Sequence, residues 1–211
     1  MPFVLDDIID KFWKDGRVKA LEEFASRHDF EFSGRDRLDL QTYQIRDFNL
    51  FKGKKAKRLK GILAKSVDTV DVRIYDYIYY GEGEKRKTTV YEIFDEGLNL
   101  PRFLIRPKRI IKWVKEVFSK ENWFYPDIPS FHAFYEIDGP YPEDIKTELS
   151  EAFVDLVSSA TRLRVEGEGP YLLMYYRGRQ TPVRDLDTTL DFVLDLWESL
   201  AGEEISDDEI V

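Results

Sequence analysis

The 211-residue sequence contains no cysteine and only two histidines, His28 and His132. The absence of cysteine excludes a disulfide framework and thiolate metal sites. Neither histidine has another metal-ligating residue at a spacing typical of metal centres. We therefore predict no metal and no other cofactor, and we interpret both histidines as structural.

Long hydrophobic runs are also missing. No stretch approaches the roughly 18 consecutive apolar residues that a membrane span needs. Residues 1–7 lack the basic and apolar regions of a secretory signal peptide. Hydrophobic residues make up 43% of the chain and aromatic residues 15%, which is too much for a disordered protein. We expect a folded, cytoplasmic protein.

Recognisable catalytic spacing is the third absence. The acidic pairs Asp6–Asp7 and Asp95–Glu96 are adjacent in sequence, so their carboxylates cannot converge on one substrate atom. The glycine motifs at 81–83 and 167–169 lack the strand-to-helix context of a phosphate-binding loop and are read as turns. We assign no catalytic residue. An acid–base site built from dispersed carboxylates stays open, and the sequence favours a protein that is not an enzyme.

The net charge of −9 conceals a strong asymmetry along the chain. Residues 52–120 contain 18 basic and 9 acidic residues, whereas the rest of the chain contains 14 basic and 32 acidic residues. Such segregation can steer a charged partner toward one region. It also arises when a lysine-rich sheet is flanked by acidic helices, so the pattern alone does not decide between the two.

Hydrophobic periodicity predicts an α+β fold, with a mainly antiparallel sheet covered by amphipathic helices. We expect one α+β domain over residues 1–202, with a division into sub-domains 1–120 and 121–202 left open, and an acidic tail at 203–211. Residues 35–56 have no clear period. Helices are predicted within 4–27 and over 107–119, 142–159 and 181–200, and strands near 30–32, 59–63, 70–80, 88–94, 103–105, 131–137, 163–165 and 171–176.

Tyrosines crowd one face of the strand predicted at 70–80. Strand alternation puts Val72, Ile74 and Ile78 on one face. The opposite face then holds the candidate binding residues Arg73, Tyr75, Tyr77 and Tyr79. If this face is uncovered, it is a binding groove or a subunit interface, because amphipathic rings beside a guanidinium suit both. If a helix covers it, the tyrosines are core residues.

A basic cluster precedes that strand. Residues 52–60 contain six basic side chains, of which Lys54, Lys55, Lys57 and Arg58 are the candidate binding residues. They could attract an anionic surface, or they could be edge-strand lysines that discourage sheet-to-sheet pairing. The predicted helix 107–119 is basic and amphipathic, which suits either a membrane surface or packing on the sheet. Nucleic acid is an unfavoured partner because the whole chain is acidic.

Several segments resemble an uncharacterised bacterial protein family, grouped as DUF3137-like. The resemblance rests on residues 48–53, 72–81, 98–107, 165–169 and 172–177, within a match over roughly 17–200. It implies no activity, since the family has no assigned chemistry or catalytic residues. Many members resemble membrane-associated proteins through an added hydrophobic segment, and we find none in this sequence.

Three functional hypotheses follow. The first is a non-enzymatic binding or protein-interaction module, with a protein partner or self-association through the sheet or the tyrosine face. The second is peripheral binding to an anionic membrane surface through residues 52–60 and the helix 107–119. The third is a small-molecule-binding protein or enzyme with a pocket between sheet and helices.

Overall fold

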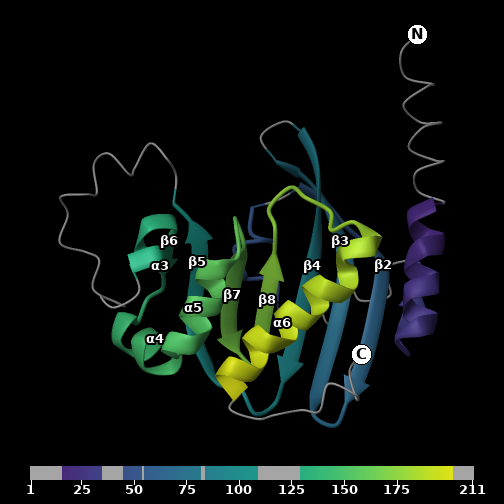
Figure 1. Cartoon of the computed structure of the whole chain (residues 1–211). Helices are drawn as coiled ribbons and strands as arrows, with labels where there is room; N and C mark the ends of the chain where they lie inside the picture. The colour runs from purple at the N-terminus through teal and green to yellow at the C-terminus, as the bar shows by residue number, and fades with distance from the viewer. Residues whose placement is uncertain (1–15, 35–44, 54, 82–83, 109–128, 202–211) are drawn as a thin grey trace.

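Eight strands form one antiparallel sheet, and the helices lie on one of its faces (Figure 1). The computed structural model describes residues 16–34, 45–53, 55–81, 84–108 and 129–201. The strands are β1 Glu31–Ser33, β2 Lys55–Val67, β3 Val70–Gly81, β4 Glu84–Asp95, β5 Leu100–Pro107, β6 Tyr135–Asp138, β7 Arg164–Gly169 and β8 Tyr171–Tyr175. This arrangement confirms the predicted α+β class with an antiparallel sheet.

The strand order is β1-β2-β3-β4-β8-β7-β5-β6. Strands β2, β3 and β4 are joined by hairpins, and the turn between β2 and β3 contains Asp68 in the left-handed conformation (φ 52°). Strand β8 then pairs with β4, and β5 lies between β7 and β6. Strands from both of the sub-domains considered above therefore alternate within one sheet.

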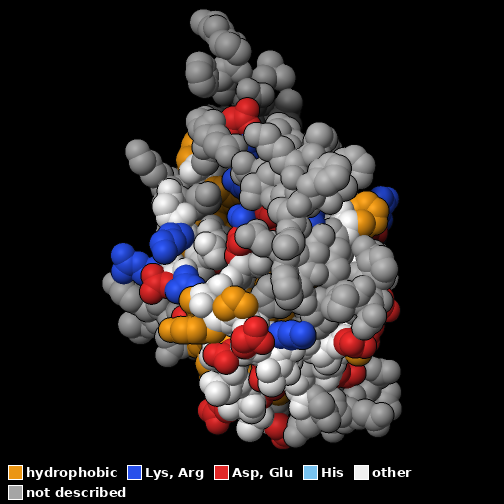
Figure 2. Space-filling view, turned by 90° about the vertical axis from the view of Figure 1, so that its left-hand side faces the viewer, with side chains coloured by type: hydrophobic (Ala, Val, Ile, Leu, Met, Phe, Trp, Pro, Cys, Tyr) orange, Lys and Arg blue, Asp and Glu red, His pale blue; other side chains and the backbone are white. Residues whose placement is uncertain are grey.

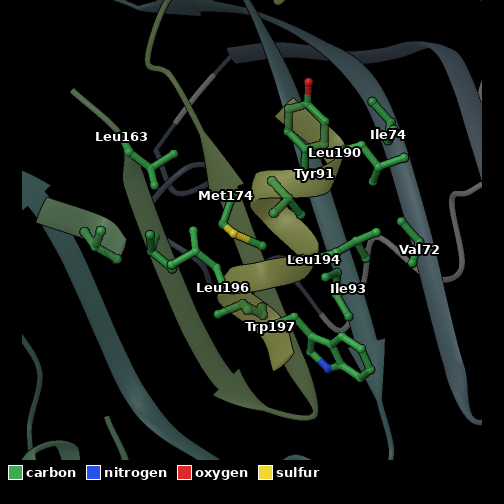
Figure 3. Packing of buried hydrophobic residues seen from close by; sticks show 14 of the residues in the cluster. Val72, Ile74, Tyr91, Ile93, Leu163, Met174, Leu190, Leu194, Leu196 and Trp197 are labelled. Atoms are coloured by element: carbon green, nitrogen blue, oxygen red, sulfur yellow. The ribbon is translucent and has the colours of Figure 1, made fainter. Parts of the chain in front are cut away.

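The helical layer comprises a helix over the described residues 16–27, together with α3 Pro129–Phe134, α4 Pro142–Glu148, α5 Glu151–Ser159 and α6 Leu186–Ala201. A short 3-10 turn, Val183–Asp185, precedes α6. Each of these helices contributes buried apolar side chains to a single core against the sheet. Figure 3 shows α6 crossing this core, with Leu190, Leu194 and Trp197 directed toward side chains of β3, β4 and β8.

The opposite face of the sheet is covered by residues 45–53, which we call the covering segment and which form successive turns rather than a helix. Its buried side chains Ile45, Phe48, Leu50 and Phe51 pack on a second core. That core also contains the tyrosines of β3, so the covering segment closes the tyrosine face.

The structure corrects three local expectations. Residues 131–134, predicted as strand, belong to α3, and the strand begins only at Tyr135. The helix predicted over 142–159 is two helices, because Leu149 leaves the helical conformation and the Ser150 side chain caps α5 by accepting a hydrogen bond from the Phe153 backbone N–H at 3.1 Å. The glycine motif at 167–169, interpreted above as a turn, belongs to strand β7, and Pro170 alone separates it from β8.

Candidate functional site

A cavity of about 890 Å³ opens between helix 16–27, the β2–β4 end of the sheet and the chain that leads into α6. We call it the basic cavity. Its lining side chains are Arg17, Val18, Ala20, Leu21, Arg58, Lys60, Asp76, Ile78, Lys85, Lys87, Gln180, Pro182 and Val183, with backbone from Gly16, Gly34 and Gly61. Among these described lining residues, five side chains are basic and Asp76 alone is acidic.

The sheet register explains why the basic side chains meet. Arg58 on β2 pairs with Ile78 on β3, and Ile78 pairs with Lys87 on β4. Two residues further along β2, Lys60 pairs with Asp76. Directly paired residues of neighbouring strands project to the same face, so these side chains form the sheet wall of the cavity.

Asp76 is the polar centre of this wall. It is 5% exposed, and its two carboxylate oxygens accept hydrogen bonds from Arg17 Nε at 2.6 Å and Nη2 at 2.9 Å. Gln180 Nε2 donates to it at 2.6 Å and Thr89 Oγ1 at 2.8 Å. Arg17 Nη1 also donates to the Thr181 carbonyl at 2.8 Å. The bidentate ion pair therefore joins helix 16–27, the sheet and the chain before α6.

The charge of the cavity follows from this pairing. Among the described lining residues, basic side chains outnumber acidic ones. Arg17 is paired with Asp76, and the other basic residues of the lining are Arg58, Lys60, Lys85 and Lys87. In a protein with a net charge of −9, such a local excess draws anions to this place. The opposing wall is apolar and is provided by helix 16–27 and by residues 182–183.

A second, shallower hollow of about 590 Å³ adjoins the basic cavity, and we call it the arginine groove. It is lined by Glu84, Lys85, Arg86, Lys87, Arg177, Gly178, Arg179 and Gln180. Lys85, Lys87 and Gln180 line both hollows. By contrast, the side of the molecule around β6, α3 and α4 presents acidic, basic and hydrophobic side chains intermixed (Figure 2).

The tyrosine face predicted as a binding groove is buried. Tyr75, Tyr77 and Tyr79 are each at most 1% exposed, and Arg73 is 8% exposed. Phe51 of the covering segment meets the Tyr77 ring edge-on at a centroid distance of 4.8 Å. Of the two alternatives left open by the sequence, the structure shows core residues, although turns rather than a helix cover them.

Tyr75, one of these buried tyrosines, bonds to the buried carboxylate of Glu92. Tyr75 Oη donates to Glu92 at 2.7 Å, and Arg73 Nη1 donates to the same carboxylate at 3.1 Å. Burial raises the pKa of Glu92, although the bonds from Tyr75 and Arg73 oppose that rise. Burial, together with the Glu92 charge, raises the pKa of Tyr75 well above its usual value. This cluster bridges neighbouring strands in the core and is a structural network.

Glu166 fastens the covering segment to the sheet. It is 1% exposed and accepts hydrogen bonds from the backbone N–H groups of Asn49 at 2.5 Å and Leu50 at 2.9 Å. Tyr175 Oη donates to it at 2.6 Å. Burial and the Glu166 charge raise the pKa of Tyr175 well above its usual value, so this phenol remains a donor.

The basic cluster predicted at 52–60 is divided by the fold. Arg58 lies in the basic cavity, where Lys60 joins it. Lys55 and Lys57 lie in β2, but their side chains fall outside the described part of the structure, as does Lys54. Of the helix predicted over 107–119, the structure describes only residues 107 and 108. Pro107 is the last residue of β5, so the predicted start of that helix is wrong. Sequence reasoning missed Arg17, Lys85, Lys87 and Gln180. The run Lys85–Arg86–Lys87 was the available signal, because hairpin pairing places it opposite residues near 78–80.

Other candidate chemistry is sparse in the described ranges. No group of three or more His, Cys, Asp or Glu side chains there could hold a metal ion. His28 Nε2 lies 2.8 Å from Asp187 Oδ1, where it links the end of helix 16–27 to α6. None of the described helices is long and apolar enough to cross a membrane.

Comparison with known proteins identifies a structure of similar fold. No protein-family model matches the chain, and no curated protein matches it. Among solved structures, the chain is similar to the crystal structure of the mycobacterial trehalose monomycolate transport factor A, TtfA, with a TM-score of 0.57. The match has 13% identity and covers 88% of this chain and 94% of that one. At this identity the two proteins share a fold, and the likeness extends no further.

Proposed function

We propose that this chain is a non-enzymatic binding protein whose basic cavity takes an anionic small molecule. The observation that supports it is the gathering of Arg58, Lys60, Lys85 and Lys87 on one wall of a cavity of about 890 Å³. Ligand pockets commonly have volumes of roughly 300–1,000 Å³ and combine apolar walls with a few polar groups. The basic cavity has both properties.

The hydrogen bonding of Asp76, the one acid among the described lining residues, favours binding over catalysis. Asp76 already accepts four hydrogen bonds and faces a permanently charged guanidinium at 2.6 Å. A general base needs a free lone pair directed at the substrate proton. Asp76 lacks one, so its role is to hold Arg17, helix 16–27 and Gln180 around the cavity.

The protein of similar fold is named as a transport factor for trehalose monomycolate. A role in binding a molecule without converting it is compatible with that name. The self-association or protein partner expected from the sequence, and the cytoplasmic location, remain part of the proposal. Membership of a DUF3137-like family, which the sequence resemblance suggested, is likewise part of the proposal.

The test is an isothermal titration of the full chain with inorganic pyrophosphate at low ionic strength. We expect saturable binding that weakens as salt is added, because the contacts are between charges. The double variant Arg58→Glu with Lys87→Glu should weaken it at least tenfold. The matched control is Arg184→Glu, a change of the same sign on a side chain that is 86% exposed and outside the cavity lining.

Two results would contradict the proposal. One is the absence of pyrophosphate binding to the folded chain. The other is equal weakening by Arg184→Glu and by the cavity variants, which would assign the effect to overall charge. A native mass spectrum of the gently purified protein adds an independent readout, since a retained anion appears as extra mass on the chain.

A further inference from the structure

We propose that the ligand is a single-chain amphiphile with an anionic head group. Its apolar chain lies against the apolar wall of the basic cavity, and its head group lies where the basic wall of that cavity meets the arginine groove. This inference rests on the proposed function and adds the chemical class of the ligand and its orientation.

The first support is that, among the described residues, the basic cavity has apolar side chains in its lining and the arginine groove does not. The basic cavity includes Val18, Leu21, Ile78, Pro182 and Val183. The arginine groove has no apolar side chain among its described lining residues, and five of them are Lys or Arg. A wholly polar anion would leave the first set of side chains without a matching surface, whereas an amphiphile matches both sets.

The second support is continuity. Lys85, Lys87 and Gln180 line both hollows, so one molecule can extend across their shared boundary. At that boundary Gln180 is already oriented by its bond to Asp76 at 2.6 Å. The ammonium groups of Lys85 and Lys87 therefore mark the point at which the ligand changes from apolar to charged.

The third support is that the groove is preformed. The loop bearing Arg177 and Arg179 is fixed to β4, because Gly178 N donates to Thr88 Oγ1 at 2.8 Å and Thr89 N donates to the Arg179 carbonyl at 3.0 Å. Gly178 has φ 72°, a conformation that suits glycine. A fixed backbone reduces the entropy lost when the two arginines bind a phosphate or a carboxylate.

The apolar wall is accessible to a ligand. Val18 on helix 16–27 is 37% exposed, and Val183, which lines the same cavity, is partly exposed. An alkyl chain against them removes this apolar surface from water, and each buried methylene strengthens binding by about fourfold. Affinity should therefore increase with chain length until the cavity is filled.

The experiment compares butyl, hexyl and octyl phosphate by isothermal titration of the full chain, below their micelle concentrations. We expect octyl phosphate to bind at least tenfold more tightly than butyl phosphate. Val18→Ser should weaken octyl phosphate several-fold and butyl phosphate less than twofold. Arg179→Glu should weaken every member of the series by a similar factor, with Arg184→Glu as the matched control.

The outcomes separate this inference from the proposed function. If all three alkyl phosphates bind equally, and their binding still depends on Arg58 and Lys87, the ligand is a polar anion and only the amphiphile is rejected. If octyl glucoside, which has a neutral head group, binds as tightly as octyl phosphate, the anionic head group is rejected. If charge reversal of Arg58 and Lys87 leaves every affinity unchanged, the proposed function itself fails. Circular dichroism of each variant confirms that it is folded.

Discussion

The two faces of the sheet are buried in different ways. The helix-covered core is built from aliphatic and aromatic side chains of five helices and includes Trp197, which is fully buried. The tyrosine core is closed by a nine-residue segment of turns, and its stability depends on polar anchors, above all Glu166 and Glu92. Apolar packing contributes to both cores, and the second core adds to it a few specific hydrogen bonds to buried carboxylates in a low-dielectric setting.

This difference indicates where the molecule is sensitive to changes in solution conditions. Apolar packing is almost insensitive to pH, whereas buried carboxylates and phenols respond to it. The basic cavity lies on the helix-covered face of the sheet, and the tyrosine core lies on the other face. Substitutions in the two cores should therefore have separable effects on stability, pH response and ligand binding.

Trp197→Ala should have the largest effect. The indole is 0% exposed, and its Nε1 donates to Asp95 at 2.9 Å. The variant therefore leaves a cavity in the core, and the buried Asp95 carboxylate loses one hydrogen-bond donor. We expect a loss of about 3–5 kcal/mol in the free energy of unfolding, measured by urea denaturation. Trp197→Phe, which retains most of the ring volume, should lose less than half as much. Equal losses would show that the hydrogen bond, rather than packing, dominates at this site.

Glu166→Ala should have a smaller global effect and a local consequence. It removes the acceptor of three hydrogen bonds, of which those from Leu50 and Tyr175 are buried and the one from Asn49 is partly buried. The expected cost is about 3 kcal/mol. Limited proteolysis should then cut the covering segment well before the helices. Glu168→Ala, at a side chain that is 42% exposed, is the control and should change neither readout.

Alkaline pH should weaken the tyrosine core next. Burial raises the folded-state pKa of Tyr77, so its contribution to stability is complete below pH 10 and decreases as the unfolded phenol ionises above that value. Tyr77→Phe should recover about 1 kcal/mol of unfolding free energy near pH 10.7 relative to wild type. At pH 8 it should cost little, since the Tyr77 hydroxyl has no hydrogen-bond partner among the described residues. The exposed Tyr80→Phe should show no such recovery.

Glu92→Gln should give the smallest effect, which is a change in how the free energy of unfolding varies with pH. Because burial raises the folded-state pKa of Glu92 above 4.5, the folded protein retains a proton that the unfolded chain releases. Wild type should therefore lose stability relative to Glu92→Gln as pH increases from 4.5 toward that raised pKa. Urea titrations at pH 4 and pH 7 measure the difference. If wild type instead gains stability relative to Glu92→Gln between pH 4 and pH 7, the ion pair with Arg73 outweighs the desolvation of Glu92.

Local patterns in the sequence predicted much of the fold. Period-two alternation correctly separated Val72 and Ile74 from Tyr75 and Tyr77, since each pair lies in a different core. The covering segment was not predicted. Its contacts are backbone N–H groups bonded to Glu166, more than 100 residues later in the chain, and such contacts leave no periodicity in the sequence.

The candidate site was predicted only in part. Arg58 was named, but Arg17, Lys87 and Gln180 come from a helix, another strand and a loop that meet only in the folded sheet. The tyrosines were singled out because of their density, which reflects a buried face closed by a neighbouring segment. Density of one residue type indicates a shared face, and it cannot tell whether that face is open.

The strand order has a consequence for how the chain folds. Strands β2, β3 and β4 are neighbours in sequence and can pair as soon as they are made, but Tyr175 of β8 pairs with Val90 of β4, 85 positions earlier. Closing so long a loop costs entropy before any contact compensates for it, and pairings of this kind slow folding. The hairpin strands should therefore form early, and β8 should join them late. Because the loop after β8 supplies Arg177, Arg179 and Gln180, the arginine groove is completed only in that last step.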